Sequence, residues 1–180
     1  MKSKILLLAV VPLVLLLFAG VWRQSASSLS PLEELGKRLF FDKNLSTPPG
    51  QECAVCHGPG VGMTGPDEEF NEKGGVYEGA VKGRFGNRKP PAAAYAGGSP
   101  VLHIDKEGNF VGGMFWDGRA TGETLGDPLA EQAMGPFLNP LEQNMPDKKS
   151  IILKIQKSDY AALFEKVWGK GSLDAAKDVD

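Results

Sequence analysis

The stretch that decides the fold is CAVCH, which runs from Cys53 to His57. The pattern C-x-x-C-H is typical of covalent c-type haem attachment, in which both thiols bond to the haem vinyl groups and the adjacent histidine ligates the iron. A structural zinc site would need four ligands, and the one other histidine, His103, has no cysteine near it. A thioredoxin-like motif would follow a strand in a βαβ unit, and no such pattern surrounds this stretch. The motif therefore predicts one haem c, held by Cys53 and Cys56, with His57 as the metal ligand.

Length and composition favour one small domain whose core is completed by a cofactor. The chain has 180 residues, which allows a single domain and a leader. Its 23 glycines and 13 prolines indicate many loops, and a haem would supply the apolar mass that such a chain lacks. The net charge of -2 offers no electrostatic attraction for nucleic acid, so we expect no nucleic-acid partner.

Residues 1–27 have the pattern of an export segment. Lys2 and Lys4 precede an apolar run that ends at Trp22, and a serine-rich stretch follows. The run is long for a cleaved signal peptide and just long enough to span a bilayer. Both a signal peptide and a retained N-terminal membrane anchor therefore remain open. In either case we expect residues 28–180 to be exported and periplasmic, where bacteria attach c-type haem.

The rest of the chain reads as mainly α, a cytochrome c-like haem domain with long Gly/Pro-rich loops. A capping box at Ser30 and a proline after it predict the start of the first helix. Glycines interrupt the pattern between 58 and 100, which favours a long functional loop with one short helix near 92–95. Apolar periodicity and turn residues predict a hairpin at 104–111 and helices at 31–41, 129–134, 139–145, 148–157 and from Ser158 to Gly169.

Four stretches in this order resemble the N-terminal, peroxidatic haem domain of the bacterial di-haem cytochrome c peroxidase / MauG family. They are LGKRLFFD from Leu35, the haem motif, FWDGRA from Phe115 and EQAMGPFLNPLE from Glu131. The resemblance covers about residues 30–180. It implies an enzyme that reduces hydrogen peroxide to water, with electrons from a small exported donor protein such as a cytochrome c or a cupredoxin.

The resemblance also implies roles for three further residues. Gln132 and Glu142 match the distal-pocket glutamine and glutamate that face bound peroxide, and Trp116 matches the tryptophan between the two haems. Splitting the O–O bond needs a proton moved between its oxygens, which a pocket carboxylate can do. Gln132 cannot titrate, so we expect it to orient peroxide or water. Without the resemblance, Glu142 reads as a solvated carboxylate at a helix start and Trp116 as a core aromatic.

The chain departs from the family pattern in three places. Residues 79–84 lack the histidine that closes the oxidised pocket in classical members, which predicts an open haem; His103, in an insert, is a weak substitute. Lys89 stands where members often have an asparagine near a calcium ion, which argues against calcium binding through that side chain. No second C-x-x-C-H follows, and an apolar stripe that begins after Ser172 is cut off at Asp180. We therefore expect a fragment whose C-terminal haem domain is missing.

Two other functions fit parts of the sequence. A mono-haem electron-transfer protein without peroxidase activity would use His57 and a methionine as the two axial ligands. The candidate methionines are Met63, Met114, Met134 and Met145. A MauG-like oxidation of an amino acid in a partner protein would need the second haem, so this chain alone argues against it.

Overall fold

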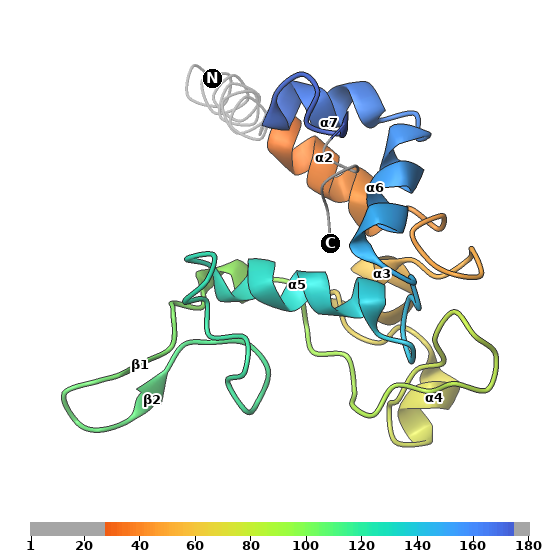
Figure 1. Cartoon of the computed structure of the whole chain (residues 1–180). Coiled ribbons are helices and arrows are strands. Elements are labelled where there is room, and N and C mark those ends of the chain that lie inside the picture. The colour runs from red at the N-terminus through yellow and green to blue at the C-terminus, as the bar shows by residue number, and fades with distance from the viewer. Residues whose placement is uncertain (1–27, 175–180) are drawn as a thin grey trace, which may run out of the picture. The chain divides into compact units, whose positions relative to one another are not determined.

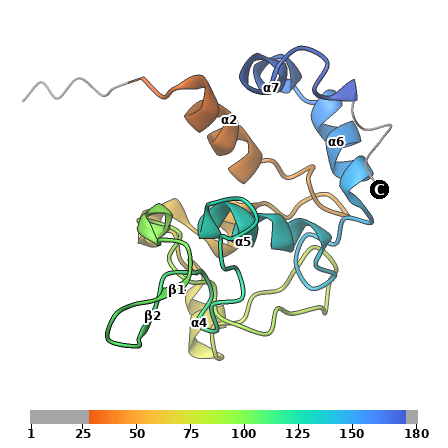
Figure 2. The same ribbon diagram turned by 60° about the vertical axis from the view of Figure 1, so that its left-hand side comes forward.

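A computed structural model describes residues 28–174, whose elements are labelled in Figures 1 and 2. The predicted leader, residues 1–27, and the last stretch, residues 175–180, lie outside the described residues. Within the described range, no helix is both long enough and apolar enough to cross a membrane. The choice between a signal peptide and an anchor concerns residues 1–27 alone and stays a prediction, as does the apolar stripe expected at the C-terminal end.

Helices from both ends of the described range form the main apolar core. α2 (Pro31–Phe40) packs against α7 (Ala161–Trp168), and the neighbouring α6 (Lys148–Gln156) contributes to the same core (Figures 1 and 2). Acidic residues in the first turn of α2 and basic residues in its last turn complement the helix dipole. The helices predicted at 31–41 and 148–157 are confirmed. The buried residues of this core are Leu35, Leu45, Ile155, Tyr160 and Leu173.

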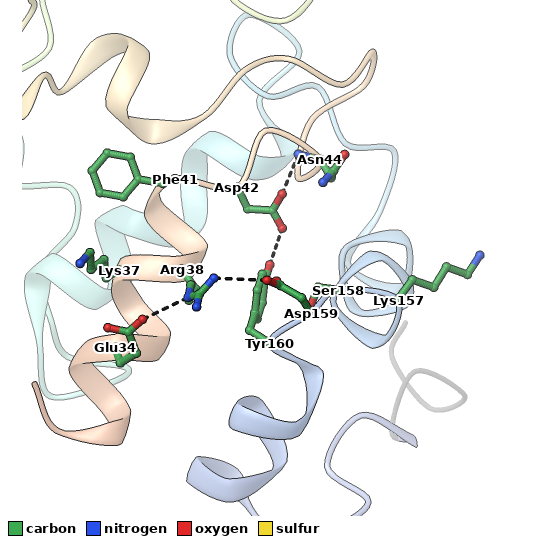
Figure 3. A pocket seen from close by; sticks show the side chains of 10 residues that line it. All are labelled: Glu34, Lys37, Arg38, Phe41, Asp42, Asn44, Lys157, Ser158, Asp159 and Tyr160. Carbon is green, nitrogen blue, oxygen red and sulfur yellow. Dashed lines mark hydrogen bonds and ion pairs between the residues drawn. The ribbon is translucent and has the colours of Figure 1, made fainter.

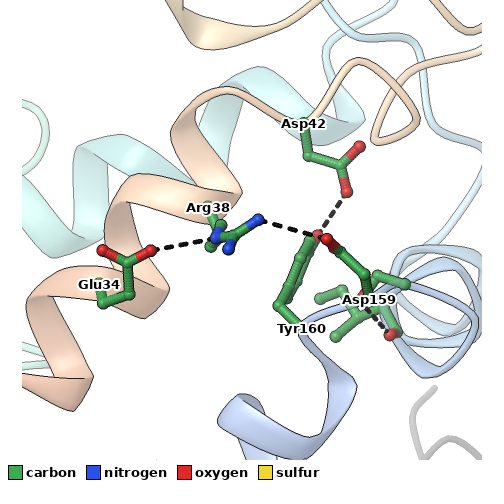
Figure 4. Close-up of polar contacts among 7 residues, drawn as sticks. Glu34, Arg38, Asp42, Asp159 and Tyr160 are labelled. Atoms are coloured by element: carbon green, nitrogen blue, oxygen red, sulfur yellow. Dashed lines mark hydrogen bonds and ion pairs between the residues drawn. The ribbon is translucent and has the colours of Figure 1, made fainter.

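Polar contacts join the same helices beside a charged pocket of about 670 Å³ (Figure 3). The Tyr160 hydroxyl donates to the buried carboxylate of Asp42. Burial raises the pKa of Tyr160, and the negative charge of Asp42 adds to that shift. Arg38 pairs with Glu34 at 3.0 Å and with Asp159 at 3.3 Å, which links α2 to the turn before α7 (Figure 4). None of the predicted site residues lines this pocket.

α5 (Pro128–Leu138) begins as predicted and ends later than predicted. The Asp127 carboxylate accepts hydrogen bonds from the first backbone N–H groups, and a proline occupies the first turn. The expected stop at Gly135-Pro136 is wrong, because the helix continues through Pro136 to Leu138. The carbonyl of Pro136 accepts from the Gln143 backbone N–H at 3.1 Å, so the following turn stabilises the last turn of the helix.

The helix predicted at 139–145 is wrong, because this stretch is a turn. The Asn139 side-chain oxygen accepts from the Leu141 N–H at 3.0 Å, and the Asn139 carbonyl accepts from the Glu142 N–H at 3.0 Å. Asparagine side chains that bond to nearby backbone compete with helix formation in this way. Asn144 adopts a left-handed conformation with φ +54° and completes the turn. The turn carries Glu142 and folds back on α5, where the Phe137 carbonyl accepts from the Met145 N–H at 2.8 Å.

The expected cap of the last helix is also wrong, although its end is confirmed. The Ser158 hydroxyl donates to the Ile155 carbonyl at 2.7 Å and therefore serves the end of α6. Tyr160 occupies the N-cap position of α7 without a side-chain cap, and Gly169 ends the helix with φ +101°. The predicted helix thus starts later than expected because its proposed cap is used by the preceding helix.

The segment between α2 and α5 contains only short elements, which confirms the expectation of long loops. They are α3 (Cys53–Cys56), η1 (Pro59–Val61), α4 (Glu68–Glu72), η2 (Ala96–Gly98), β1 (His103–Ile104) and β2 (Phe110–Val111). The two strands pair antiparallel, so the predicted hairpin is confirmed, and it projects away from α5 (Figure 1). The helix expected near 92–95 is replaced by the single turn of η2. The fold class, mainly α, is confirmed.

Candidate haem site

The attachment motif forms one helical turn. Cys53 and Cys56 are the first and last residues of α3, and both are unpaired and half-buried. Residues three apart on a helix lie on the same face, so both thiols are available to one partner. The backbone N–H of His57 donates to the Cys53 carbonyl at 2.9 Å, which fixes the histidine directly below the turn.

The imidazole of His57 is oriented by the loop that follows it. Its Nδ1 lies 3.1 Å from the backbone carbonyl oxygen of Met63. A carbonyl can only accept, so Nδ1 carries the proton and Nε2 keeps a free lone pair. Metal-ligating histidines are commonly held by this kind of second hydrogen bond. Together with the two thiols, this donor set fits a covalently attached haem with an iron ligated by Nε2 of His57.

Burial and one nearby carboxylate raise the pKa values of the two cysteine thiols. Desolvation raises the pKa of Cys53 to about 11 and that of Cys56 to about 12, and the negative charge of Glu142 contributes to both shifts. The unattached thiols are therefore neutral at physiological pH and resist oxidation, because the thiolate is the reactive form. The shared influence of Glu142 also means that this carboxylate lies near the attachment motif.

Glu142 is half-buried in the turn after α5, which differs from a solvated carboxylate at a helix start. Its Oε1 accepts from the Asn139 side-chain amide at 2.7 Å. Burial raises its pKa, although the Asn139 hydrogen bond and electrostatic interactions with His57 and Arg119 oppose that rise. A carboxyl group with this balance of forces can hold a proton and release it, as general acid–base catalysis requires.

The loop that lacks a histidine packs directly against Glu142. The Ala80 N–H donates to the Glu142 carbonyl at 2.7 Å. Gly79 approaches so closely that a Cβ at this position would lie 2.3 Å from the Leu141 carbonyl oxygen and 2.7 Å from that of Glu142. Sequence analysis missed this role for Gly79, because the chain has many glycines and only the approach of a distant segment distinguishes this one.

Gln132 and its neighbour Glu131 occupy α5. Gln132 is half-buried, and no hydrogen bond joins its side chain to Glu142 within residues 28–174. Glu131 was not predicted as a site residue. Its carboxylate accepts from the backbone N–H groups of Gly122 at 2.7 Å, Thr124 at 2.7 Å and Leu125 at 3.0 Å. These backbone hydrogen bonds, chiefly the one from Gly122, lower the pKa of Glu131, so its carboxyl group stays ionised. The same hydrogen bonds hold the loop at residues 122–125 against α5.

Trp116 lies on the surface, so the reading as a core aromatic is wrong. Its side chain is 83% exposed, in the loop between the hairpin and α5. The guanidinium of Arg88 lies 4.9 Å from the indole centroid, and Arg88 also pairs with Asp117 at 3.4 Å. Arg119 donates to both oxygens of Asp117, at 3.0 and 2.8 Å. Sequence analysis did not connect Arg88 with this loop.

Two other positions expected to distinguish this chain from its family, His103 and Lys89, make contacts elsewhere. His103 is exposed at the start of β1, and its Nδ1 lies 2.9 Å from the Val101 carbonyl oxygen. The Lys89 side chain runs along Gly75. Within the described range, no group of three or more histidine, cysteine and acidic side chains is placed to hold a metal ion.

The four methionines proposed as alternative axial ligands differ in their surroundings. Met145 is buried, and its sulfur accepts from the Thr47 hydroxyl at 3.4 Å. Met134 is 55% exposed on α5. Met63 supplies its carbonyl to His57, and Met114 is half-buried before the Trp116 loop. Of the four methionines, Met145 therefore has the sulfur that is least available to an iron.

Comparison with known proteins places the chain in one family. A family model for di-haem cytochrome c peroxidases matches residues 30–179. The methylamine utilization protein MauG of Paracoccus denitrificans is 38% identical over 167 residues, which cover 91% of this chain and 41% of that protein. Cytochrome c551 peroxidase of Pseudomonas aeruginosa is 36% identical over 111 residues, which cover 62% of this chain and 25% of that protein.

A solved structure has the same fold. The diheme peroxidase BthA from Burkholderia thailandensis superposes with a TM-score of 0.69 and 29% identity, over 84% of this chain and 38% of that chain. The chain thus spans about two-fifths of the length of MauG and of BthA. Membership of this family implies binding of c-type haem, for which the motif at Cys53 and His57 is suited. With a match over nearly all of its residues after the predicted leader, the chain belongs to the di-haem cytochrome c peroxidase family.

Proposed function

We propose that residues 28–180 form the N-terminal, peroxidatic haem domain of an enzyme that reduces hydrogen peroxide to water. One haem c is attached through Cys53 and Cys56 and ligated by His57, and when bound it supplies the redox chemistry. The observation that carries this proposal is the half-buried carboxyl group of Glu142, whose charge is felt by both attachment cysteines. The family to which the chain belongs supports the same reaction class.

Glu142 is the proposed catalytic acid and base. The Asn139 amide occupies Oε1, which leaves Oε2 as the atom that takes a proton from peroxide and returns it to the departing oxygen. Gln132 is the proposed orienting group, since its amide can donate to peroxide but cannot titrate. Loop 79–84 forms a wall beside Glu142 and contributes no histidine that would compete with peroxide.

Trp116 is the proposed route for electrons. An indole on the surface is placed to meet an arriving electron source, which we propose is a C-terminal haem domain supplied in turn by a small exported donor. The predicted export segment at residues 1–27 would place this reaction in the periplasm. A methionine-ligated electron carrier is the less favoured alternative, because it gives the Glu142 carboxyl group no task.

The substitution Glu142→Gln tests this function. It keeps the size and the hydrogen bond to Asn139 but removes the base, so we expect the reaction of the haem-loaded chain with peroxide to slow by about 10²–10⁴. Stopped-flow absorbance after mixing with peroxide measures this rate without an electron donor. Haem content and the resting spectrum should stay unchanged.

Glu107→Gln is the matched control, because it removes a carboxylate from the exposed tip of the hairpin. Its rate should equal that of the parent chain. A parental rate in Glu142→Gln would remove Glu142 from the mechanism. A loss of haem from that variant would make Glu142 a structural residue instead.

A further inference from the structure

Trp116 is exposed to solvent, yet a cation covers one face of its indole. The ζ-carbon of Arg88 lies 4.9 Å from the centre of the ring. Arg88 comes from the long loop before η2, whereas Trp116 follows the hairpin. The carboxylate of Asp117, the residue next to Trp116, holds the Arg88 Nη1 at 3.4 Å. The neighbour of the indole therefore fixes the cation that covers it.

The loop that carries Trp116 is held rigidly. Phe115 has a φ of +63°, in the left-handed region that bulky residues rarely adopt. The Arg119 guanidinium stacks 3.6 Å from the Phe115 ring, and the Gly118 N–H donates to the Phe115 carbonyl at 3.1 Å. These contacts stabilise a backbone conformation that would otherwise cost free energy. The indole thus projects from a loop with little freedom to rearrange.

The immediate electrostatic surroundings of the indole are positive. Arg88 and Arg119 share the single carboxylate of Asp117, so two positive charges face one negative charge. The side chains of Arg88, Arg119 and Asp117 are 38%, 50% and 31% exposed. Solvent therefore screens their charges less than it screens those of fully exposed groups. Two guanidinium groups therefore contact one carboxylate directly beside Trp116.

We propose that Arg88 is a positioning residue for Trp116, which holds the indole in place and opposes its one-electron oxidation. A cation over an aromatic face is attracted by the neutral ring and repelled once that ring becomes positive. Arg88 thus favours the neutral indole over its radical cation. This inference rests on the proposed role of Trp116 as the route for electrons.

A cation over Trp116 would protect the indole from irreversible oxidation. With haem bound, Trp116 would pass one electron to it and would regain one electron from the reduced donor side, so its own composition would be unchanged. If the donor electron is late, an oxidised indole would lose its N–H proton to water and then react with oxygen. By disfavouring the oxidised indole, Arg88 lets electrons pass while it protects Trp116 from this damage.

Photo-oxidation of the full haem-loaded chain tests the proposal without peroxide. Light and persulfate convert tris(bipyridine)ruthenium(II) to ruthenium(III), which removes one electron from an indole and returns to ruthenium(II). Mass spectrometry then measures oxygenated tryptophan at Trp116 and at Trp168. Trp168 is the internal reference, because it is 62% exposed and no cation within residues 28–174 covers its ring.

The expected result is a charge-specific change in the Trp116-to-Trp168 oxidation ratio. Arg88→Gln should raise the ratio by roughly two- to five-fold, whereas Arg88→Lys should leave it near the parental value. Arg119→Gln is the matched control. It removes a guanidinium from the same carboxylate, but the parental Arg119 stacks on Phe115 and not on Trp116. Its effect should be smaller than that of Arg88→Gln.

The opposite results would overturn the proposal. An unchanged ratio in Arg88→Gln, or an equal rise in Arg119→Gln, would show that Arg88 does not tune Trp116. If circular dichroism shows that Arg88→Gln is unfolded, the Arg88→Lys variant decides between the two outcomes. A higher Trp116-to-Trp168 oxidation ratio in Arg88→Lys would mean that the shape of the arginine, rather than its charge, protects the indole. A failure of the Glu142 experiment would leave this ratio unaffected, so the two proposals fail separately.

Discussion

The terminal helices and the loops between them hold their shape by different means. α2, α6 and α7 enclose a core with Leu35 and Leu45 almost fully buried. Between residues 51 and 126, the buried apolar side chains are those of Tyr77 and Ala120. This middle segment relies on hydrogen bonds between backbone and side chains, such as the one that the Gly122 N–H donates to Glu131 of α5 and the one between His57 and the Met63 carbonyl. The segment that carries the haem-attachment motif is therefore the one with the least apolar support, and a bound haem would add most to it.

Removing haem attachment is the strongest test of this contrast. Cys53→Ala or Cys56→Ala, exported with the attachment machinery, should yield little stable protein, because the middle segment loses its main apolar partner. Limited proteolysis with mass spectrometry should detect the first cuts between residues 58 and 126 and later cuts in α2, α6 and α7. Equal accumulation and equal protease resistance of the haem-free form would show that the loops support themselves.

Acid should affect the reaction with peroxide through Glu142, in the turn that packs against the middle segment. Burial raises the pKa of this carboxyl, so protonation removes the base at a pH above the usual range for glutamate. The peroxide rate should fall about tenfold per pH unit below that pKa, as expected for a single required base. Because the folded chain binds this proton more tightly than the unfolded chain, acid at this group stabilises the fold, and the loss of rate is not unfolding. A pH–rate profile of Glu142→Gln should lack this limb.

Gly79 tests the contact between the loops and the turn after α5. Gly79→Ala puts a methyl group against the Leu141 carbonyl, and we expect it to destabilise the fold by about 1–3 kcal/mol. Gly60→Ala is the control, because nothing lies within 4 Å of its added Cβ. Thermal unfolding followed by circular dichroism measures both variants. Equal melting midpoints would mean that loop 79–84 gives way easily and does not fix Glu142.

The smallest effect concerns Gln143, whose side-chain amide is buried and has no hydrogen-bond partner within the described residues. Gln143→Met removes this unsatisfied group at similar volume, so we expect a gain of about 1 kcal/mol. That gain corresponds to a melting midpoint about 2–4 °C higher. Gln156→Met should do the reverse, because the Gln156 amide donates to the Leu173 carbonyl at 2.6 Å. A loss of stability in Gln143→Met would reveal a partner for the amide.

The contrast also explains which features the sequence could predict. α2 and the hairpin depend on residues close together in the chain, and each was predicted near its observed position. The turn at Asn139 was missed because the local apolar pattern suits a helix. The Asn139 side chain instead accepts a hydrogen bond from the Leu141 backbone N–H and stabilises a turn. Arg88 over Trp116 and Gly79 against Glu142 were missed for another reason. Each contact joins segments far apart in sequence, and no local pattern marks the partner.

The pairing of Asp42 with Tyr160 has a consequence for the order of events during biogenesis. If the chain is exported with its N-terminus first, α2 and the attachment cysteines reach the periplasm before the residues that complete the core. Leu35 and Leu45 cannot be enclosed until Ile155, Tyr160 and Leu173 have followed. The CAVCH stretch therefore spends an interval on an open, unlatched chain. That interval gives a haem-attaching enzyme access to both thiols before the last helices close the domain.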